Sequence, residues 1–174
     1  MNSIEKKIES HLRIFDDFPN QGIKFFDISI ILKTPDVFNS IIEKFVGFAK
    51  NLDFDVITSP DARGFLLGPA LALRLNKPFV MVRKKNKLPG PTIKQGYGLE
   101  YGSNVIEIQE DAFAGFKKAL IVDDIVATGG TSFAIQQLLE KENIQIVGQC
   151  FIISLEKLLN MKNISGSFYS ILKK

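Results

Sequence analysis

The chain has 174 residues, 45% of them hydrophobic, which is long enough for one well-filled core and short for two. Its 22 Lys and Arg residues against 19 Asp and Glu residues give a formal net charge of +3, which does not suggest a nucleic-acid-binding protein. A single cysteine, Cys150, excludes an internal disulfide and a thiolate metal cluster, and a single histidine, His11, excludes a multi-histidine metal site.

The N-terminal residues lack the apolar core of a signal peptide, and no stretch approaches ~18 uninterrupted apolar residues. We therefore expect a cytoplasmic protein that does not associate with a membrane. His11 is far in sequence from every acidic or glycine-containing motif, and there is no G-x-S-x-G turn. These two observations argue against a Ser-His-Asp hydrolase.

Helical and strand-like patterns alternate along the chain, which predicts an α/β fold with a mostly parallel central sheet flanked by helices. Apolar residues at helical spacing predict helices over 2–14, 36–52, 64–75 and 130–141, and a short helix near 156–161. Short apolar runs predict strands over 54–59, 78–82, 118–123 and 144–154, and a final strand near 168–172. No repeat or linker interrupts this order, so we expect one domain over residues 1–174. In such a sheet, ligands bind beyond the carboxyl ends of the strands, and the loops that leave this edge should meet at one site.

A polar segment without periodicity runs from residue 83 to about residue 98. A loop of this length inside a compact domain predicts a lid or a binding loop. After it, residues 99–101 and 104–108 are predicted to form an antiparallel ribbon that turns at Gly102 and Ser103.

Residues 122–132 read VDDIVATGGTS and carry the most specific functional signal in the chain. A buried strand is expected to end in the adjacent carboxylates Asp123 and Asp124, followed by a Thr-Gly-Gly-Thr turn that opens a helix. Carboxylates accept hydrogen bonds from sugar hydroxyls, and small residues let backbone N–H groups surround a phosphate at the positive end of a helix. The segment therefore predicts a ribose phosphate site. The alternative is that the acidic pair and the glycines only close a strand-to-helix loop.

The segment SPDARGFLLG, residues 59–68, is expected to end one strand and to begin the next helix. Its backbone N–H groups and the guanidinium of Arg63 would then point to where a diphosphate could bind. A cation is unusual at a helix N-terminus, because the helix dipole disfavours it there. The alternative is an Arg63 that pairs with Asp61.

Two further segments fall in and after the polar loop. VRKKNKLPGPT, residues 82–92, has cations at four of the five positions 83–87, and its prolines and glycine oppose regular secondary structure. Taken alone, it could also be a solvated charged loop or a nucleic-acid patch. LEYG, residues 99–102, follows, and a lid that carries Glu100 and Tyr101 could close over a reacting centre.

The segment FFDIS, residues 25–29, follows a turn-like stretch, PNQG, at residues 19–22. An aromatic ring here could cover the face of a flat base. The chain has 15 Phe residues, so a role in the core would also account for any one of them.

In this order the five segments resemble the adenine phosphoribosyltransferases within the type I phosphoribosyltransferase family. The resemblance runs from about Phe18 through Leu139 and depends on RKKNKLPGPT, LEYG and VDDIVATGGT. It implies the type I fold with a small N-terminal hood formed mainly by about residues 1–35, and a homodimer. It also implies transfer of the 5-phosphoribosyl group of phosphoribosyl diphosphate to adenine, which gives AMP and diphosphate. Mg²⁺ would assist, carried mainly by the substrate diphosphate and not by direct protein ligands.

The resemblance further implies a role for each matched residue. The ribose hydroxyls would be held by Asp123 and Asp124, and the 5-phosphate by Ala127, Thr128, Gly129, Gly130 and Thr131. The diphosphate would be surrounded by Asp61, Ala62, Arg63, Arg83, Lys84 and Lys87, with Arg63 catalytic. The base would be read by the backbone of Lys24 and Phe26, with Phe25 packed on its ring. The remaining catalytic residues would be Glu100, beside the purine N7, and Tyr101, which helps to close the lid.

Ala127 supports adenine as the base. The resemblance implies that the hypoxanthine and guanine enzymes have an Asp at this position, which assists N7, whereas this chain has a methyl group. Here Glu100 would have to supply the carboxylate. The departures from the family pattern are Phe26 in place of an Arg, Ser154 in place of an acidic residue, and Asn160 with Met161 in place of a Gly-Arg pair. Base selectivity and the segment after Phe151 are thus the features that the resemblance supports least.

Two alternatives remain open. A noncatalytic regulator of this fold could sense phosphoribosyl diphosphate while it binds nucleic acid. It would need a basic face or an added domain, which a net charge of +3 and 174 residues do not favour. Among enzymes, one that acts on a different purine is the nearest rival.

Overall fold

The computed structural model describes residues 3–97 and 104–174. Their contacts divide the chain into two compact units, residues 1–44 and residues 45–174. No helix in the described ranges has both the length and the apolar character needed to cross a membrane.

The first unit holds two short strands and several helices: α1 (Ser3–His11), β1 (Arg13–Phe15), β2 (Phe25–Asp27), α2 (Ser29–Lys33) and the beginning of α3 (Pro35–Ala49). The prediction of one helix over 2–14 is wrong at its end, because β1 and β2 pair antiparallel with Ile14 opposite Phe26. The guanidinium of Arg13 donates to the carboxylate of Asp27, with Nε 2.9 Å from Oδ2. These partners are distant in sequence, so helical spacing alone could not show where α1 ends.

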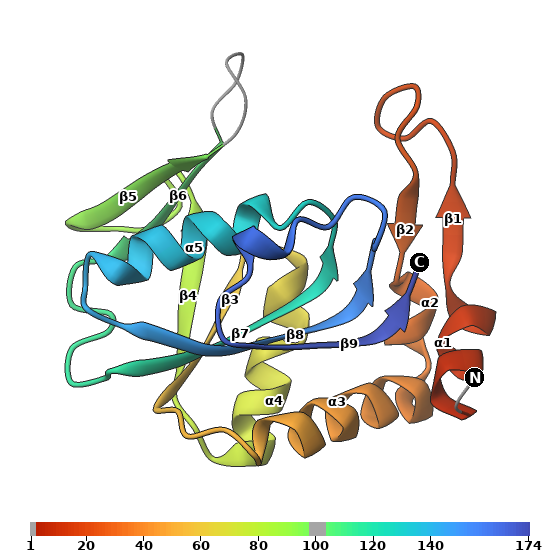
Figure 1. The fold of residues 1–174 in the computed structure, drawn as a ribbon, viewed down its shortest axis with the longest axis horizontal. Helices are drawn as coiled ribbons and strands as arrows, with labels where there is room; N and C mark the ends of the chain where they lie inside the picture. The colour runs from red at the N-terminus through yellow and green to blue at the C-terminus, as the bar shows by residue number, and fades with distance from the viewer. Residues whose placement is uncertain (1–2, 98–103) are drawn as a thin grey trace. The chain divides into compact units, whose positions relative to one another are not determined.

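The second unit is built on one seven-stranded sheet in the order β5-β6-β4-β3-β7-β8-β9 (Figure 1). The strands are β3 (Val56–Pro60), β4 (Phe79–Lys84), β5 (Thr92–Tyr97), β6 (Asn104–Gln109), β7 (Lys118–Val126), β8 (Gln145–Ser154) and β9 (Ser167–Lys173). Five neighbouring strands, from β4 to β9 in this order, run parallel. β6 is antiparallel to β4, and β5 is antiparallel to β6. The prediction of a mostly parallel sheet flanked by helices is confirmed.

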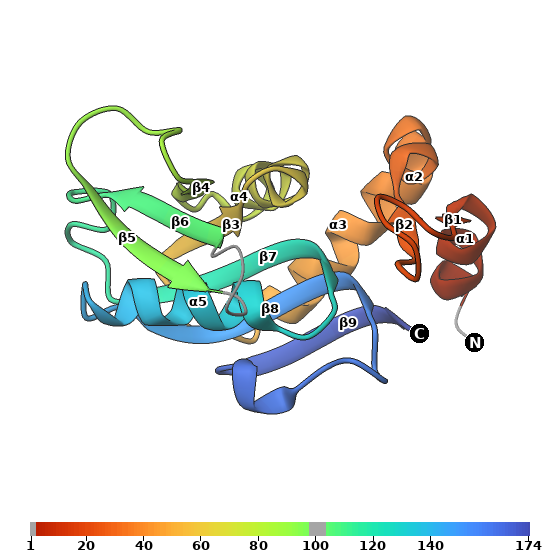
Figure 2. The ribbon, with the colours of Figure 1, turned by 90° about the horizontal axis from the view of Figure 1, so that it is seen from above.

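Figure 2 shows α4 (Gly68–Leu75) and α5 (Gly130–Glu140) on opposite faces of this sheet. Under α5, the core includes the fully buried side chains of Ile135 and Leu138 against Ile121 of β7. Burial of one such side chain contributes about 1.5–3 kcal/mol to folding. Adjacent residues of a strand point to opposite faces, so the same strand also packs toward α4.

Three other predictions about the elements need correction. The helix predicted over 64–75 is divided into the 3₁₀ helix η1 (Arg63–Leu66) and α4. Pro69 lies in the first turn of α4, the one place where the missing N–H of a proline costs nothing. The short helix predicted near 156–161 is a turn, and the 3₁₀ helix η2 (Met161–Asn163) follows it. The side chain of Asn160 accepts a hydrogen bond from the N–H of Lys162, which fixes where η2 begins.

The third correction concerns the segment predicted as a loop from residue 83 to about 98. β4 continues to Lys84, and Thr92–Tyr97 forms β5. The antiparallel ribbon is therefore made by β5 and β6, with Tyr97 opposite Asn104. Residues 99–101, the partner predicted for β6, lie outside the described residues. What remains of the predicted loop is the basic loop, residues 85–91, between β4 and β5.

Candidate functional site

The carboxyl ends of β3, β4 and β7 lie at one edge of the sheet, because the three strands are parallel neighbours. The loops after β3 and β4 start next to each other, and the N–H of Asp61 donates to the carbonyl of Val82 at 2.9 Å. This edge carries most of the residues that the sequence nominated, and the structure brings them together from three separate segments.

The acidic pair lies inside β7 and not after it. The strand continues through Asp123 and Asp124 to Val126, which pairs with Ser154 of β8. The side chain of Asp124 is only 3% exposed, and its Oδ2 lies 2.9 Å from Nε of Arg63. Asp123 lines a cavity of about 390 Å³ at the end of the strand. The two carboxylates are therefore adjacent in sequence but have different surroundings.

Burial raises the pKa of Asp123 well above the ordinary value of an aspartate, and the neighbouring charge of Asp124 raises it further. Burial also raises the pKa of Asp124, while the guanidinium of Arg63 opposes that rise. The pair therefore holds its negative charges at a cost in free energy, and hydroxyl donors of a bound ligand would reduce that cost.

The phosphate loop, residues 127–131, joins β7 to α5. Gly129 has a φ of +82°, a left-handed conformation that favours glycine, and a Cβ there would come within 2.9 Å of the Cβ of Asn163. The N–H of Gly130 donates to the hydroxyl of Thr128 at 3.3 Å, and the side chain of Asn163 donates to the carbonyl of Thr128 at 2.9 Å. The phosphate loop thus leads into the N-terminus of the 11-residue helix α5. Backbone N–H groups at a helix N-terminus are suited to bind a phosphate.

The cavity of about 390 Å³ includes every residue of the phosphate loop. Its lining residues are Tyr97, Asn104, Asp123, Ile125, Val126, Ala127, Thr128, Gly129, Gly130, Thr131, Ser132 and Phe151. Tyr97, Asn104 and Phe151 carry no sequence signal of the kind that marks the phosphate loop. Phe151 is the partner of Asp123 across β7 and β8, a register that only the assembled sheet reveals.

The loop after β3 supplies the cationic side of the site. Asp61 and Ala62 are joined by a cis peptide bond, and Arg63 begins η1. Nε of Arg83 donates to Oδ2 of Asp61 at 3.0 Å. Asp61 thus has Arg83 as an ion-pair partner, and Arg63 reaches Asp124. Lys84 and Lys87 are exposed, at the end of β4 and in the basic loop.

The residues nominated for the base belong to a different unit of the chain. Lys24, Phe25 and Phe26 belong to the first unit, in and before β2. The ring of Phe25 packs edge-on against Phe18, with centroids 5.0 Å apart, and Phe26 is buried. Glu100 and Tyr101, nominated for catalysis, lie outside the described residues.

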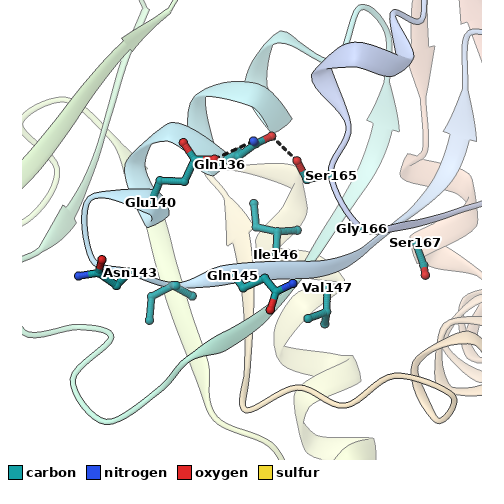
Figure 3. Close-up of a pocket in the computed structure, with 10 residues that line it drawn as sticks. Gln136, Glu140, Asn143, Gln145, Ile146, Val147, Ser165, Gly166 and Ser167 are labelled. Carbon is teal, nitrogen blue, oxygen red and sulfur yellow. Dashed lines mark hydrogen bonds between the residues drawn. The ribbon is translucent and has the colours of Figure 1, made fainter.

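A larger cavity, of about 770 Å³, lies at the opposite edge of the same sheet (Figure 3). The second half of α5, the start of β8 and residues 165–167 line it, and the hydroxyl of Ser165 donates to Gln136 inside it. Its lining includes Gln136 and Glu140 from the second half of α5, toward the negative end of the helix dipole, which disfavours a phosphorylated ligand. The smaller cavity at the carboxyl edge is the better candidate site.

Comparison with known proteins shows the family of the chain. The model of the phosphoribosyl transferase domain matches residues 27–172. The adenine phosphoribosyltransferase of Malacoplasma penetrans is 44% identical over 168 residues, which are 97% of this chain and 98% of that protein. A crystal structure of adenine phosphoribosyltransferase from Thermoanaerobacter pseudethanolicus has a TM-score of 0.91 and 40% identity, covering 97% of this chain and 99% of that one.

The Saccharomyces cerevisiae adenine phosphoribosyltransferase, solved with an imino-altritol bisphosphate and adenine, also has a TM-score of 0.91. It is 34% identical, and the match covers 98% of this chain and 99% of that one. The resemblance in sequence is thereby confirmed at the level of family and fold. The chain belongs to the phosphoribosyltransferase family, among the adenine phosphoribosyltransferases.

Proposed function

We propose that this protein transfers the 5-phosphoribosyl group of phosphoribosyl diphosphate to N9 of adenine. The bond from C1′ to the diphosphate oxygen breaks, the bond from C1′ to N9 forms, N9 loses its proton, and AMP and diphosphate leave. One observation carries the proposal most directly: Asp123 and the whole phosphate loop line one cavity, with Arg63 joined to Asp124 beside it.

In this proposal the ribose lies against the acidic pair. The hydroxyls donate to Asp123 and Asp124, whose buried charges gain from such donors. The 5-phosphate accepts hydrogen bonds from the phosphate loop at Ala127, Thr128, Gly129, Gly130 and Thr131. A sugar phosphate bound at both ends has its C1′ held in a fixed position for attack.

The diphosphate would leave toward the loops after β3 and β4. Cleavage at C1′ builds positive charge on the ribose ring and negative charge on the leaving diphosphate. The diphosphate would be surrounded by Asp61, Ala62, Arg63, Arg83, Lys84 and Lys87. Cations already in place stabilise the developing charge without reorganisation. Arg63 acts on both sides, because its guanidinium also neutralises Asp124.

The base is assigned to the first unit and to the segment around residue 100. We propose that residues 1–35 act as the hood of a single phosphoribosyltransferase domain. The backbone of Lys24 and Phe26 would read the adenine edge, with Phe25 on its ring. Glu100 would share a proton with the purine N7, and Tyr101 would help to exclude water that could hydrolyse the activated ribose.

The residues also fit a role for Mg²⁺ that the substrate carries. In the described ranges no group of three or more His, Cys, Asp or Glu side chains could hold a metal ion. Because Asp123 and Asp124 are assigned to the ribose hydroxyls, the ion would be held mainly by the phosphate oxygens of the substrate and by water. When bound, the ion would supply positive charge to the leaving diphosphate.

We further propose a cytoplasmic homodimer. The side chains of Leu66 and Leu73, on η1 and α4, are 46% and 85% exposed, and Met81 of β4 is 41% exposed. Large apolar side chains exposed on neighbouring elements favour burial against a second copy. Light scattering should then give the mass of two 19.5 kDa chains.

The test is a transfer assay with purified protein, phosphoribosyl diphosphate and Mg²⁺. Adenine, hypoxanthine, guanine and uracil are supplied in turn, and the nucleotide and diphosphate formed are measured. The proposal expects AMP and diphosphate in equal amounts with adenine. Turnover of another base in preference to adenine would correct the substrate, and no nucleotide from any base would refute the activity.

A further inference from the structure

Glu107 is a buried carboxylate in the middle of β6. It is 1% exposed and lies opposite Arg83 of β4 and Lys94 of β5. Its Oε1 accepts hydrogen bonds from the N–H groups of Lys87, at 2.9 Å, and Leu88, at 3.2 Å. The other oxygen, Oε2, accepts from the hydroxyl of Thr92 at 3.3 Å. One side chain thus fastens the middle of the basic loop to the sheet.

The hydrogen bonds outweigh the cost of burying this charge. Burial alone would raise the pKa of Glu107, yet the N–H groups of Lys87 and Leu88 and the charge of Lys94 bring it below its ordinary value. The carboxylate is therefore ionised at neutral pH, and its bonds to the loop are charge-assisted. Such bonds are about twice as strong as those between neutral groups.

The contacts around Glu107 favour a role in the loop over a simple ion pair. Nζ of Lys94 is 3.9 Å from Oε2, and the side chain of Lys94 is 47% exposed, so this contact is weak. The start of the basic loop is held by the sheet, through the N–H of Lys85 and the carbonyl of Val105 at 3.0 Å. In the described structure, the side-chain bonds to the N–H groups of Lys87 and Leu88 come from Glu107.

We infer that Glu107 is a positioning residue for the diphosphate side of the site. By holding the N–H groups of Lys87 and Leu88, it fixes the basic loop so that Lys87 stays near the edge where Arg83 meets Asp61. This inference rests on the proposed function, because the loop matters for turnover only if a diphosphate binds there. Glu107 itself touches no reacting atom in this account.

The first measurement is hydrogen exchange of the Lys87 and Leu88 amides by NMR, in the protein without substrate. Glu107→Ala should speed their exchange at least about tenfold, since it removes a charged acceptor from both N–H groups. Glu107→Gln keeps one acceptor oxygen and should lie between Glu107→Ala and the wild type. Lys94→Gln and Glu110→Gln, which alter the weak ion pair and an exposed glutamate near the end of β6, should leave both amides unchanged.

The second measurement separates positioning from general loosening of the fold. Glu107→Ala should raise the KM for phosphoribosyl diphosphate and the Kd for diphosphate, measured by calorimetry, by about tenfold each. The KM for adenine should stay within about twofold, and Glu107→Gln should recover part of the lost affinity. Where Glu107→Ala fails to fold, Glu107→Gln carries both measurements with smaller effects in the same direction.

Two results would overturn the inference. One is unchanged exchange of the two amides in both Glu107 variants, and the other is unchanged diphosphate affinity in a variant whose amides have lost protection. Failure of the proposed function looks different. In that case the wild-type protein makes no AMP, while the exchange experiment still reports whether Glu107 holds the basic loop.

Discussion

Nε of Arg63 and Oδ2 of Asp124 lie 2.9 Å apart, so one ion pair joins the loop after β3 to the strand that carries the acidic pair. In the proposed site, Arg63 binds the diphosphate of the substrate and Asp124 binds its ribose. A ligand that contacts both sides would be held by groups that already constrain each other. If phosphoribosyl diphosphate binds as proposed, we expect its ribose and diphosphate halves to bind together and not independently.

The first prediction concerns Asp124. Asp124→Asn removes the charge that accepts from the ribose and balances Arg63, so the Kd for phosphoribosyl diphosphate should rise by about tenfold or more. Calorimetry with the free ligand measures this directly. Asp111→Asn, an exposed aspartate outside the sheet, is the matched control and should bind as the wild type does. Equal affinity of Asp124→Asn and the wild type would remove the ribose contact from the account.

The second prediction concerns the phosphate loop. Asn163→Ala removes the hydrogen bond to the carbonyl of Thr128, which should loosen the loop at a cost of about 1 kcal/mol. The KM for phosphoribosyl diphosphate should rise about fivefold, while the KM for adenine changes little. Lys162→Ala, at the exposed neighbouring position, should leave both values unchanged. A change only in the adenine KM would place Asn163 on the wrong side of the site.

The third prediction follows from the raised pKa of Asp123. Between the ordinary pKa and the raised pKa, the folded protein binds more protons than the unfolded chain, so stability from this group falls as pH rises through that window. Asp123→Asn removes the disfavoured charge and should raise both the free energy of unfolding and the Tm. The gain should be larger at about pH 8 than at about pH 5.

The same substitution should weaken binding of phosphoribosyl diphosphate, because the amide is a poorer acceptor for a ribose hydroxyl. Urea unfolding at the two pH values and calorimetry therefore report opposite changes for Asp123→Asn. A variant that is less stable at both pH values would show that the carboxylate stabilises the free protein, contrary to this account.

The fourth prediction concerns Glu100, which was nominated from the sequence and lies outside the described residues. Glu100→Gln should lower kcat by about 10²-fold or more, since it removes a proton-transfer group, and should leave the KM for phosphoribosyl diphosphate nearly unchanged. Steady-state kinetics with each substrate varied in turn measures both values. An unchanged kcat would exclude the role proposed for this side chain.

Much of the fold was predictable because its signals are local. The strand around Ile121 holds a run of four apolar residues, 119–122, and the helix that starts at Gly130 follows a distinctive turn. β5 was missed because Thr92–Tyr97 mixes polar residues and glycine, and it becomes a strand by pairing with β6. Pairing between segments leaves little trace in the periodicity of either one.

The site residues also divide into those that have a local sequence signal and those that do not. The phosphate loop and the acidic pair were nominated because their residues are contiguous and chemically unusual. Asn163 and Glu107 were not, since each acts on a segment far away in sequence. In β6, Glu107 lies between Ile106 and Ile108, where alternation predicts a solvent-facing side chain, yet all three residues are buried. Only the packing of the basic loop over that face explains the difference.

The central claim is that one sugar phosphate binds where β7 gives way to α5, and a crystal structure of the protein soaked with AMP tests it most directly. The account predicts the phosphate within hydrogen-bond distance of the N–H groups of residues 128–131, and the ribose hydroxyls on Asp123 and Asp124. An AMP molecule bound elsewhere, for example in the cavity between α5 and β8, with the phosphate loop empty, would contradict it.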